Sequence, residues 1–336
     1  MRIPSILGSC ILATSVHAGL AAEQHALPLA PANVHWGYYD ATIEPVLRIG
    51  SGDTVRVETL VARGLERLRM AGAREDEISD AMRQVEETVT ERMGSHPLTG
   101  PIYVEGAEPG DVLEVQILEI DLMQDVGVGA FLPHGGTLPE DFPYGALELI
   151  RLDRETRTAE LGSGITIPLR PFFGSIGVAP PRLSGRISSN PPGAHAGNLD
   201  NKELVAGTTL FLPVHVAGGL LSIGDGHAAQ GDGEVSGTAI ETSLSGTVKI
   251  VLHKDLGIQW PRAETPTHYL SMGLHPDLDE AAKLATREMI DFLVAEKGLS
   301  PRDAYILCSL AVDLRVTQLV DGTKGIHALL PKAVFE

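Results

Sequence analysis

Cysteine is almost absent from this chain of 336 residues, which has 2 cysteines, Cys10 and Cys308. Because Cys10 lies in an N-terminal segment that we expect to be removed, the mature chain keeps one cysteine and has no internal disulfide. Aromatic residues are also scarce, at 4% of the chain, whereas hydrophobic residues as a whole make up 43%. We therefore expect a mainly aliphatic core that is large enough to be stable without disulfides.

Positively charged residues are also fewer than negatively charged ones. The chain has 26 Lys and Arg residues against 44 Asp and Glu residues, which gives a formal net charge of -18. This balance argues against nucleic acid and anionic membrane surfaces as partners, because both are negatively charged. It is compatible with a protein that handles a neutral or cationic small molecule.

Several catalytic motifs are missing. The sequence has no GxSxG nucleophile elbow, no Gly-Ser-rich amidase loop with an accompanying lysine, no nucleotide-binding glycine motif after a strand and no HExxH motif. A thiol nucleophile would have to be Cys308, which lies among apolar residues and is expected to be an inert core residue. What remains are loops rich in acidic residues and histidine, whose side chains suit a divalent metal and a metal-activated water.

The N-terminus has the composition of a secretory signal peptide. Arg2 provides a short positive region, and residues 3–16 are mostly apolar. Two alternative cleavage sites of the small-residue type follow, Val16-His17-Ala18 and Leu20-Ala21-Ala22. The segment is too short to span a membrane. We therefore predict a signal peptide at residues 1–22, a mature chain of residues 23–336, and a periplasmic or secreted protein.

The residue pattern predicts a mainly β fold. With 37 glycines and 22 prolines, the chain is rich in turns, which suits many short strands. Residues 122–196 are predicted to be rich in loops. Alternation of apolar and polar residues predicts strands, at 54–58, 95–106, 112–117, 208–216 and 246–252, with closing strands at 313–316 and 326–331.

Helices are predicted in three segments. Residues 62–94 form a charged helical excursion whose apolar residues share one helix face: Ile78, Met82, Val85 and Val89. A second helix covers residues 277–296, with Asp277 as its N-cap, Glu280 closing a capping box and Gly298 as its C-cap. A third begins at Ser300, followed by Pro301 at the first helical position.

These segments predict an α+β fold that is mainly β, with β-sandwich or barrel-like lobes and a few helices. We expect a β-rich N-terminal lobe up to about residue 195 and an α+β C-terminal lobe at about 196–336. Together they form one catalytic unit, from which residues 62–94 depart as a helical excursion or lid.

The stretch Leu221–Glu234 is the strongest candidate for a functional site. It places acidic side chains and a histidine among four glycines, which let the backbone approach a ligand closely. On an extended backbone, Asp225 and His227 lie on one face, as half of a metal site would require. Asp232 and Glu234 repeat this spacing. The alternative is a polar hairpin, because Gly-Asp-Gly is also common in turns.

Two further segments carry candidate ligands. Residues 190–202 have no apolar period and contain His195, Asn198 and Asp200 among small residues. This segment is either a shaped functional loop or a plain connector. His96 enters a predicted strand beside glycine and proline, where it is either within reach of a ligand or on the surface.

Three longer motifs, taken together, resemble the acetamidase/formamidase family. They are LTGPIYVEGAEPGD at 98–111, HAGNLD at 195–200 and GDGHAAQGDGE at 224–234, with DLRVTQ at 313–318 as a fourth. The resemblance covers nearly the whole mature chain and favours a functional site over a hairpin. It implies a β-rich scaffold, a bound divalent metal, a homo-oligomer, and hydrolysis of short amides to carboxylate and ammonia. The signal peptide and the helical excursion depart from the family pattern.

The resemblance and the ligand chemistry together give a set of expected roles. Asp200, Asp225 and His227 are the expected ligands of a divalent metal, with zinc expected and calcium as the alternative. Glu234 is the expected base, and Asp232 could also serve as one. The remaining candidates are Asn198 for orienting the substrate, and His96 and His195 as additional ligands.

Two other functions remain open from the sequence. One is an exported β-sandwich protein that binds a ligand without turnover, because a fold does not determine function. The retained acidic residues and histidine argue against it. The other is an amidase of a larger amide, because residues 35–39 and the helical excursion could border a larger pocket.

Overall fold

The computed structural model describes residues 22–162 and 164–336. The predicted signal peptide lies outside the described residues except for residue 22, so its cleavage stays a prediction. Among the described residues, no helix is both long and apolar enough to cross a membrane.

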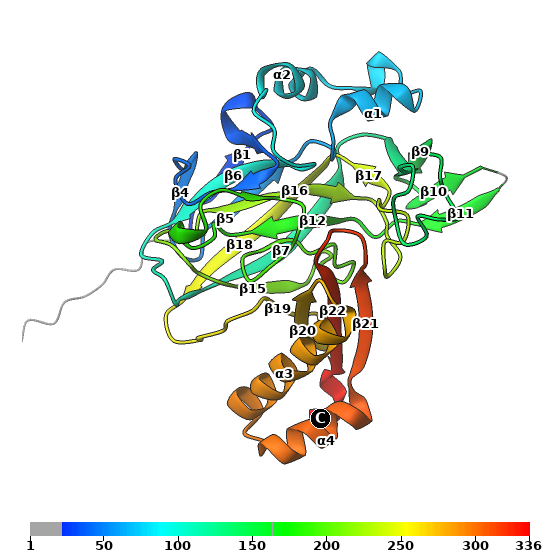
Figure 1. The fold of residues 1–336 in the computed structure, drawn as a ribbon. Coiled ribbons are helices and arrows are strands. Elements are labelled where there is room, and N and C mark those ends of the chain that lie inside the picture. Colours follow the sequence, from blue (N-terminus) through cyan, green and yellow to red (C-terminus); the bar gives the residue numbers. More distant parts are fainter. Residues whose placement is uncertain (1–21, 163) are drawn as a thin grey trace, which may run out of the picture.

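The body of the protein is built on two large β-sheets (Figure 1). The first sheet has nine strands, in the order β1 (Gln24–Leu27), β5 (Thr54–Glu58), β18 (Leu244–His253), β7 (Val112–Leu122), β15 (Thr209–Pro213), β19 (Arg262–Glu264), β20 (His268–His275), β22 (Lys324–Pro331) and β21 (Asp313–Gln318).

The second sheet contains eleven strands. Its main path runs through β11 (Ile165–Pro168), β10 (Thr158–Leu161), β9 (Ala146–Asp153), β8 (Val126–Phe131), β17 (Glu241–Thr242), β16 (Leu221–His227), β12 (Phe172–Gly177) and β14 (Ala196–Asn198). β6 (Pro97–Val104) pairs with β16 and also with β2 (Val34–Trp36) and β4 (Leu47–Ile49). A small separate sheet joins β3 (Tyr38–Tyr39) to β13 (Ile187–Ser188).

The largest core cluster lies between the two sheets, as expected for a sandwich. The alternation predicted for 54–58 is confirmed, because Val55 and Val57 are fully buried while Arg56 is exposed. Side chains such as Ile102 and Ile223 enter the same cluster from the second sheet. The cluster is almost entirely aliphatic, which agrees with the scarcity of aromatic residues.

Strands from before and after residue 195 alternate within both sheets. In the first sheet, β18 lies between β5 and β7; in the second, β16 pairs with both β12 and β6. The expected boundary near residue 195 therefore falls inside a shared core, because long-range strand pairing joins the two halves. The part that stands apart is the C-terminal β19–β22 region, which is covered by two helices, α3 (Leu278–Lys297) and α4 (Pro301–Ala311) (Figure 1).

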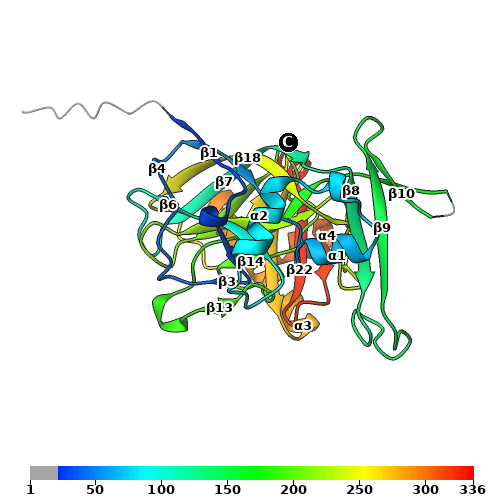
Figure 2. The ribbon, with the colours of Figure 1, turned by 90° about the horizontal axis from the view of Figure 1, so that it is seen from above.

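The predicted helical excursion is two short helices rather than one. α1 (Leu65–Met70) ends before Gly72, whose φ of 101° is left-handed, and α2 (Asp80–Thr88) follows a 3-10 turn at Glu75–Glu77. Met82 and Val85 are buried as the pattern predicted, and they pack in one cluster with side chains of β8. Figure 2 shows α1 beside β8, and α2 packs next to α1.

Residues 122–196 are rich in loops, as predicted, but six strands, β8 to β13, also lie within them. Gly127 lies in one of these strands, β8. A Cβ on this residue would lie 2.8 Å from Ile240 Cγ2 and 2.9 Å from the carbonyl oxygen of Glu241. Glycine therefore permits close strand packing here instead of marking a turn.

The C-terminal helices begin at the predicted residues. The side chain of Asp277 accepts a hydrogen bond from the backbone N–H of Glu280, and Gly298 ends α3 with a left-handed φ of 68°. Glu280 itself pairs with Lys283 instead of closing a capping box. Cys308 is buried on α4, where burial raises the pKa of its thiol, as expected of an inert core residue.

Replacement of Ser300 by alanine tests the N-cap of α4. Ser300 Oγ accepts a hydrogen bond from the backbone N–H of Asp303 at 3.1 Å. Ser300→Ala should lower the free energy of unfolding by about 1 kcal/mol, because one N–H group of the first turn loses its partner. Ser309→Ala, at an exposed position of the same helix, is the matched control and should be neutral or slightly stabilising. Equal denaturation midpoints for the two variants would contradict the prediction.

Candidate active site

A buried cluster of acidic side chains and one histidine lies around the ends of β14, β16 and β17. The cluster consists of three overlapping groups of three residues. Within each group, one ligand atom from each residue lies within 4.8 Å of the ligand atoms of the other two. We call the residues of these groups the acidic cluster: Asp200, Asp225, His227, Glu234, Glu241 and Asp321. The first five expose at most 7% of their surface.

The contacts converge on one imidazole nitrogen. His227 Nε2 lies 3.4 Å from Asp225 Oδ1, 3.3 Å from Glu241 Oε2 and 3.9 Å from Asp200 Oδ1. These four atoms, together with Glu234 Oε2, are buried and have no hydrogen-bond partner among the described residues. Buried polar atoms without partners are rare, because desolvation is costly. Carboxylate oxygens and an imidazole nitrogen in this arrangement fit a divalent cation.

Gln230 determines which nitrogen of His227 carries the proton. Gln230 Nε2 donates to the backbone carbonyl of Asp200 at 2.7 Å, so its Oε1 faces His227 Nδ1 at 2.9 Å as an acceptor. His227 Nδ1 must therefore be the donor, which leaves the lone pair of the neutral imidazole on Nε2. A lone pair that faces three carboxylates is favourable only if a proton or a cation lies between the nitrogen and the carboxylate oxygens. Metal-binding histidines commonly have their second ring nitrogen held by a hydrogen bond of this kind.

Backbone strain is concentrated at three residues of the cluster. Asp200, Asp225 and Glu234 have φ values of 46°, 58° and 43°, in the left-handed region that non-glycine residues rarely adopt. Such conformations cost on the order of 1 kcal/mol or more each and often occur at functional sites. The strand β16 therefore does not keep a regular extended form at Asp225, although Asp225 and His227 still meet as the sequence predicted.

The cluster needs a glycine in the neighbouring strand. Gly174 of β12 faces the cluster, and a Cβ on it would lie 2.4 Å from Asp200 Oδ1, 2.5 Å from Asp225 Oδ2 and 2.9 Å from His227 Cε1. No side chain other than hydrogen fits that space. The backbone carbonyl of Gly174 also accepts a hydrogen bond from the N–H of Asp200, at 3.1 Å, which holds the loop against the strand.

The pKa values of the cluster reflect negative charges buried together. Burial and the charge of Glu234 raise the pKa of Asp200 well above its usual value, and burial raises that of Asp321 to about 7. Burial also raises the pKa of Glu234. For His227, burial acts to lower the pKa, but the charges of Glu241 and Asp225 outweigh it and raise the pKa. Without a cation, the cluster therefore holds protons, and a cation would take their place.

Most of the predicted site residues are brought together. Asp200, Asp225, His227 and Glu234 belong to the acidic cluster. Asn198 is adjacent, since its Nδ2 donates to Asp200 Oδ2 at 2.8 Å. The amide oxygen of Asn198 accepts from Ser175 Oγ at 2.8 Å, so Asn198 holds Asp200 in place. His96 Nε2 lies 3.8 Å from Asp225 Oδ2, at the edge of the cluster.

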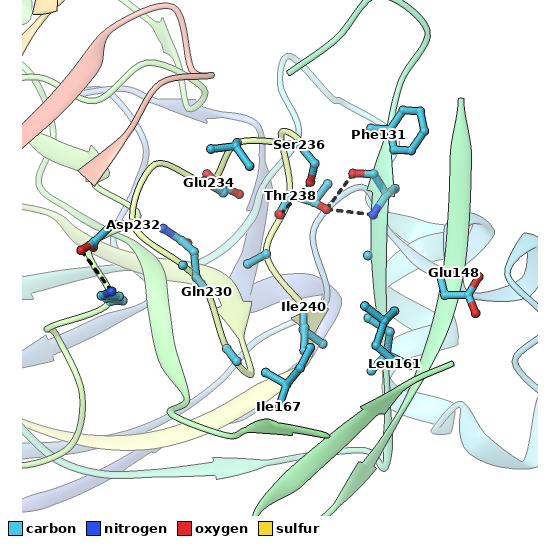
Figure 3. Close-up of a pocket in the computed structure, with 18 of the residues that line it drawn as sticks. Phe131, Glu148, Leu161, Ile167, Gln230, Asp232, Glu234, Ser236, Thr238 and Ile240 are labelled. Carbon is cyan, nitrogen blue, oxygen red and sulfur yellow. Dashed lines mark hydrogen bonds and ion pairs between the residues drawn. The ribbon is translucent and has the colours of Figure 1, made fainter. Parts of the chain in front are cut away.

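Two predicted residues lie elsewhere. Asp232 pairs with Lys202 at 3.1 Å, away from the cluster groups (Figure 3). His195 packs edge-on against the ring of Tyr39, with ring centroids 5.1 Å apart, and is not in any of the groups. Burial lowers the pKa of His195 to about 4. Both residues sit next to the cluster in sequence, but their side chains are directed to other partners.

Sequence reasoning missed Glu241 and Asp321. Glu241 stands between Ile240 and Leu244 in an otherwise apolar and small-residue stretch, and an acidic residue in such a place is a signal that could have been used. Asp321 gives no such signal, because Val-Asp-Gly-Thr is ordinary turn sequence.

Two cavities adjoin the cluster. The smaller, of about 170 Å³, is polar and is bordered by the five carboxylates of the acidic cluster, by His96 and Asn198, and by Arg63 and Arg67 of the helical excursion. The larger, of about 770 Å³, is a mostly apolar groove between β8–β11 and the loop 229–240. Figure 3 shows this groove, where Thr238 Oγ1 ties the loop to the backbone of Ala130. The groups suited to chemistry face the smaller cavity.

Comparison with known proteins identifies the family of this chain. Residues 30–190 and 184–336 match the Acetamidase/Formamidase family. This chain belongs to that family. Family membership agrees with the resemblance of the motifs at 98–111, 195–200 and 224–234, and two of these supply residues of the acidic cluster.

Individual acetamidases and formamidases are about 30% identical to this chain in sequence. A formamidase of Methylophilus methylotrophus is 31% identical over 315 residues, which cover 72% of this chain and 77% of that relative. A putative formamidase of Schizosaccharomyces pombe is 29% identical, and the match spans 62% of this chain and only 61% of that relative. The crystal structure of an acetamidase from Bacillus halodurans superposes with a TM-score of 0.78 at 34% identity, covering 92% of this chain and 98% of that one. The predicted fold class, mainly β with a few helices, is confirmed.

Replacement of Gly174 by alanine tests whether the space beside the cluster is needed for a cation. The added methyl group would overlap the carboxylates of Asp200 and Asp225, so Gly174→Ala should lose bound metal while remaining folded. Gly231→Ala is the control, because nothing lies within 4 Å of its added Cβ. Metal content by mass spectrometry and thermal melting should be measured on both. Full metal occupancy in a folded Gly174→Ala protein would show that the cation does not lie beside β12.

Proposed function

We propose that this protein hydrolyses short linear amides to a carboxylate and ammonia, with the help of a divalent cation in the acidic cluster. The observation that carries the proposal is the set of partnerless ligand atoms at one wall of a small polar cavity. Membership of the family supports the reaction type. The volume of about 170 Å³ supports a small substrate, because pockets for larger ligands typically measure about 300–1,000 Å³.

Asp200, Asp225 and His227 would hold the cation. Zinc is the proposed ion and calcium the alternative, since the group combines one imidazole with carboxylates. When bound, such a cation acts as a Lewis acid on the amide carbonyl and makes a water molecule more acidic. Asn198 and Gln230 serve this site indirectly: Asn198 holds the Asp200 carboxylate, and Gln230 holds the His227 ring.

Glu234 is the proposed acid–base residue. Its Oε2 atom is buried and has no hydrogen-bond partner in the described part of the chain, and the residue borders the polar cavity. Burial raises the pKa of this carboxyl group above its ordinary value, as is common for carboxyl groups that act in acid–base catalysis. Glu234 would take a proton from the attacking water and give it to the nitrogen. The C–O bond forms, the C–N bond breaks, and the nitrogen leaves as ammonia.

The proposal is tested by ammonia release from a panel of amides, with metal content measured on the same sample. Formamide, acetamide and longer amides should be compared, and removal of the metal by a chelator should abolish release. A metal-loaded, folded protein that releases ammonia from none of them would contradict the proposal and favour a binding protein without turnover.

Three variants in the same assay separate ligands from the acid–base residue. Asp225→Ala and His227→Ala should lose both metal and activity, because each removes a ligand. Glu234→Gln should keep the metal and lose about 10²–10⁴-fold in activity, the usual contribution of acid–base catalysis. Asp232→Asn is the control and should retain both, since Asp232 pairs with Lys202. Loss of metal from Glu234→Gln would make Glu234 a ligand instead.

We also propose that the protein is exported and that its mature chain begins between residues 19 and 23. The basis is the apolar segment followed by small residues at positions 16–22. Mass spectrometry of protein isolated from the exported fraction should show the shortened N-terminus, and an intact Met1 would contradict cleavage. The homo-oligomeric state likewise stays a prediction, and light scattering would measure it.

A further inference from the structure

Two arginines that form no ion pair with the described residues border the polar cavity. Arg63 and Arg67 line it together with the carboxylates of the acidic cluster. Other arginines of residues 62–94 are paired: Arg69 with Glu75, Arg74 with Asp76, Arg83 with Asp80 and Arg92 with Glu86. Within the described part of the chain, Arg63 and Arg67 form no ion pair, and the buried Nη2 atom of Arg67 has no hydrogen-bond partner.

The fold holds these arginines in place. Leu65 and Leu68 of α1 are fully buried in the cluster that includes side chains of β8. The N–H of Leu65 donates to Glu86 Oε2 of α2 at 3.1 Å, and the N–H of Arg63 donates to the carbonyl of Ser95 at 2.7 Å. The start of α1 is therefore anchored on three sides, and Arg67 is presented to the cavity from a fixed backbone.

Two neighbouring guanidinium groups without a carboxylate partner are suited to bind an anion. Burial, then the charge of Arg63, lowers the pKa of Arg67, while the charge of Glu241 raises it. Both arginines line the same small cavity, where their positive charges repel each other. An anion between them would relieve this repulsion, and the planar guanidinium group matches a carboxylate in geometry. The carboxylates of the acidic cluster do not fill this role, because none of them pairs with either arginine.

We propose that the substrate is a short amide that itself carries a carboxylate, which Arg67 and Arg63 bind while the amide group faces the acidic cluster. This inference rests on the proposed function and specifies its substrate class. Malonamate represents the class. Its hydrolysis adds the oxygen of water to the amide carbon, breaks the C–N bond and transfers both protons of water to the nitrogen, which gives malonate and ammonium.

The test compares malonamate with acetamide in the metal-loaded protein. The wild-type protein should have the higher kcat/KM for malonamate. Arg67→Gln should lower kcat/KM for malonamate by about ten- to a hundredfold, mainly through KM, which is the usual effect of losing a hydrogen bond to a charged group. Its kcat/KM for acetamide should be nearly unchanged. Arg67→Lys should restore part of the malonamate activity, and Arg69→Gln, on the same helix, is the matched control.

Each other outcome has a defined meaning. Equal loss for both amides in Arg67→Gln would mean that Arg67 serves the acidic cluster, and it would overturn the inference, as would a wild-type preference for acetamide. If Arg67→Gln does not fold, Arg63→Gln at the exposed edge of the cavity should show the same selective loss, and its absence would overturn the inference. If wild-type protein hydrolyses no amide, the proposed function fails. Malonamate binding would then be measured by calorimetry. Binding by the wild-type protein that is lost in Arg67→Gln would still support the arginine site, whereas no binding by the wild-type protein would overturn the inference.

Discussion

Negative charge buried at one point is the constraint on which the arrangement of this protein depends. Asp200, Asp225 and Glu241 surround a single nitrogen of His227, and Glu234 lies within the same group of ligand atoms. Burying one unpaired charge costs several kcal/mol, so such a group is stable only with protons or a cation among the carboxylates. The surrounding structure has to hold the carboxylates together against their repulsion.

The fold meets this requirement through unusual backbone conformations, whereas the side-chain types are ordinary. Three residues of the cluster adopt left-handed backbone conformations, which turn their side chains toward one another. Gly174 leaves the space that a side chain would occupy, and Gln230 and Asn198 fix the orientation of His227 and Asp200. The strain is tolerated because the adjoining strands are paired on both sides and covered by the core.

The polar cavity combines parts that are distant in sequence. The acidic cluster supplies negative charge on one part of its lining, and Arg63 and Arg67 supply positive charge on another. A neutral amide needs only the first of these. The second is explained if the substrate carries a carboxylate, and it comes from the helical excursion at residues 62–94. The larger apolar groove lies on the other side of loop 229–240, and Glu234 and Thr238 border both spaces.

The sequence by itself determined the features that depend on neighbouring residues. Strand alternation at 54–58, the N-cap of α4 at Ser300 and the motif at 224–234 are local patterns, and the structure contains all three. Features that depend on distant contacts were decided only by the tertiary structure. Glu241 and Asp321 join the site through strand pairing and chain closure, which no local pattern encodes. Asp232 and Glu234 are acidic residues only two positions apart, yet their side chains have different surroundings. Glu234 turns into the cluster through its left-handed backbone, whereas Asp232 turns outward to Lys202. The sequence does not separate the two, because burial and charge pairing are properties of the folded surroundings.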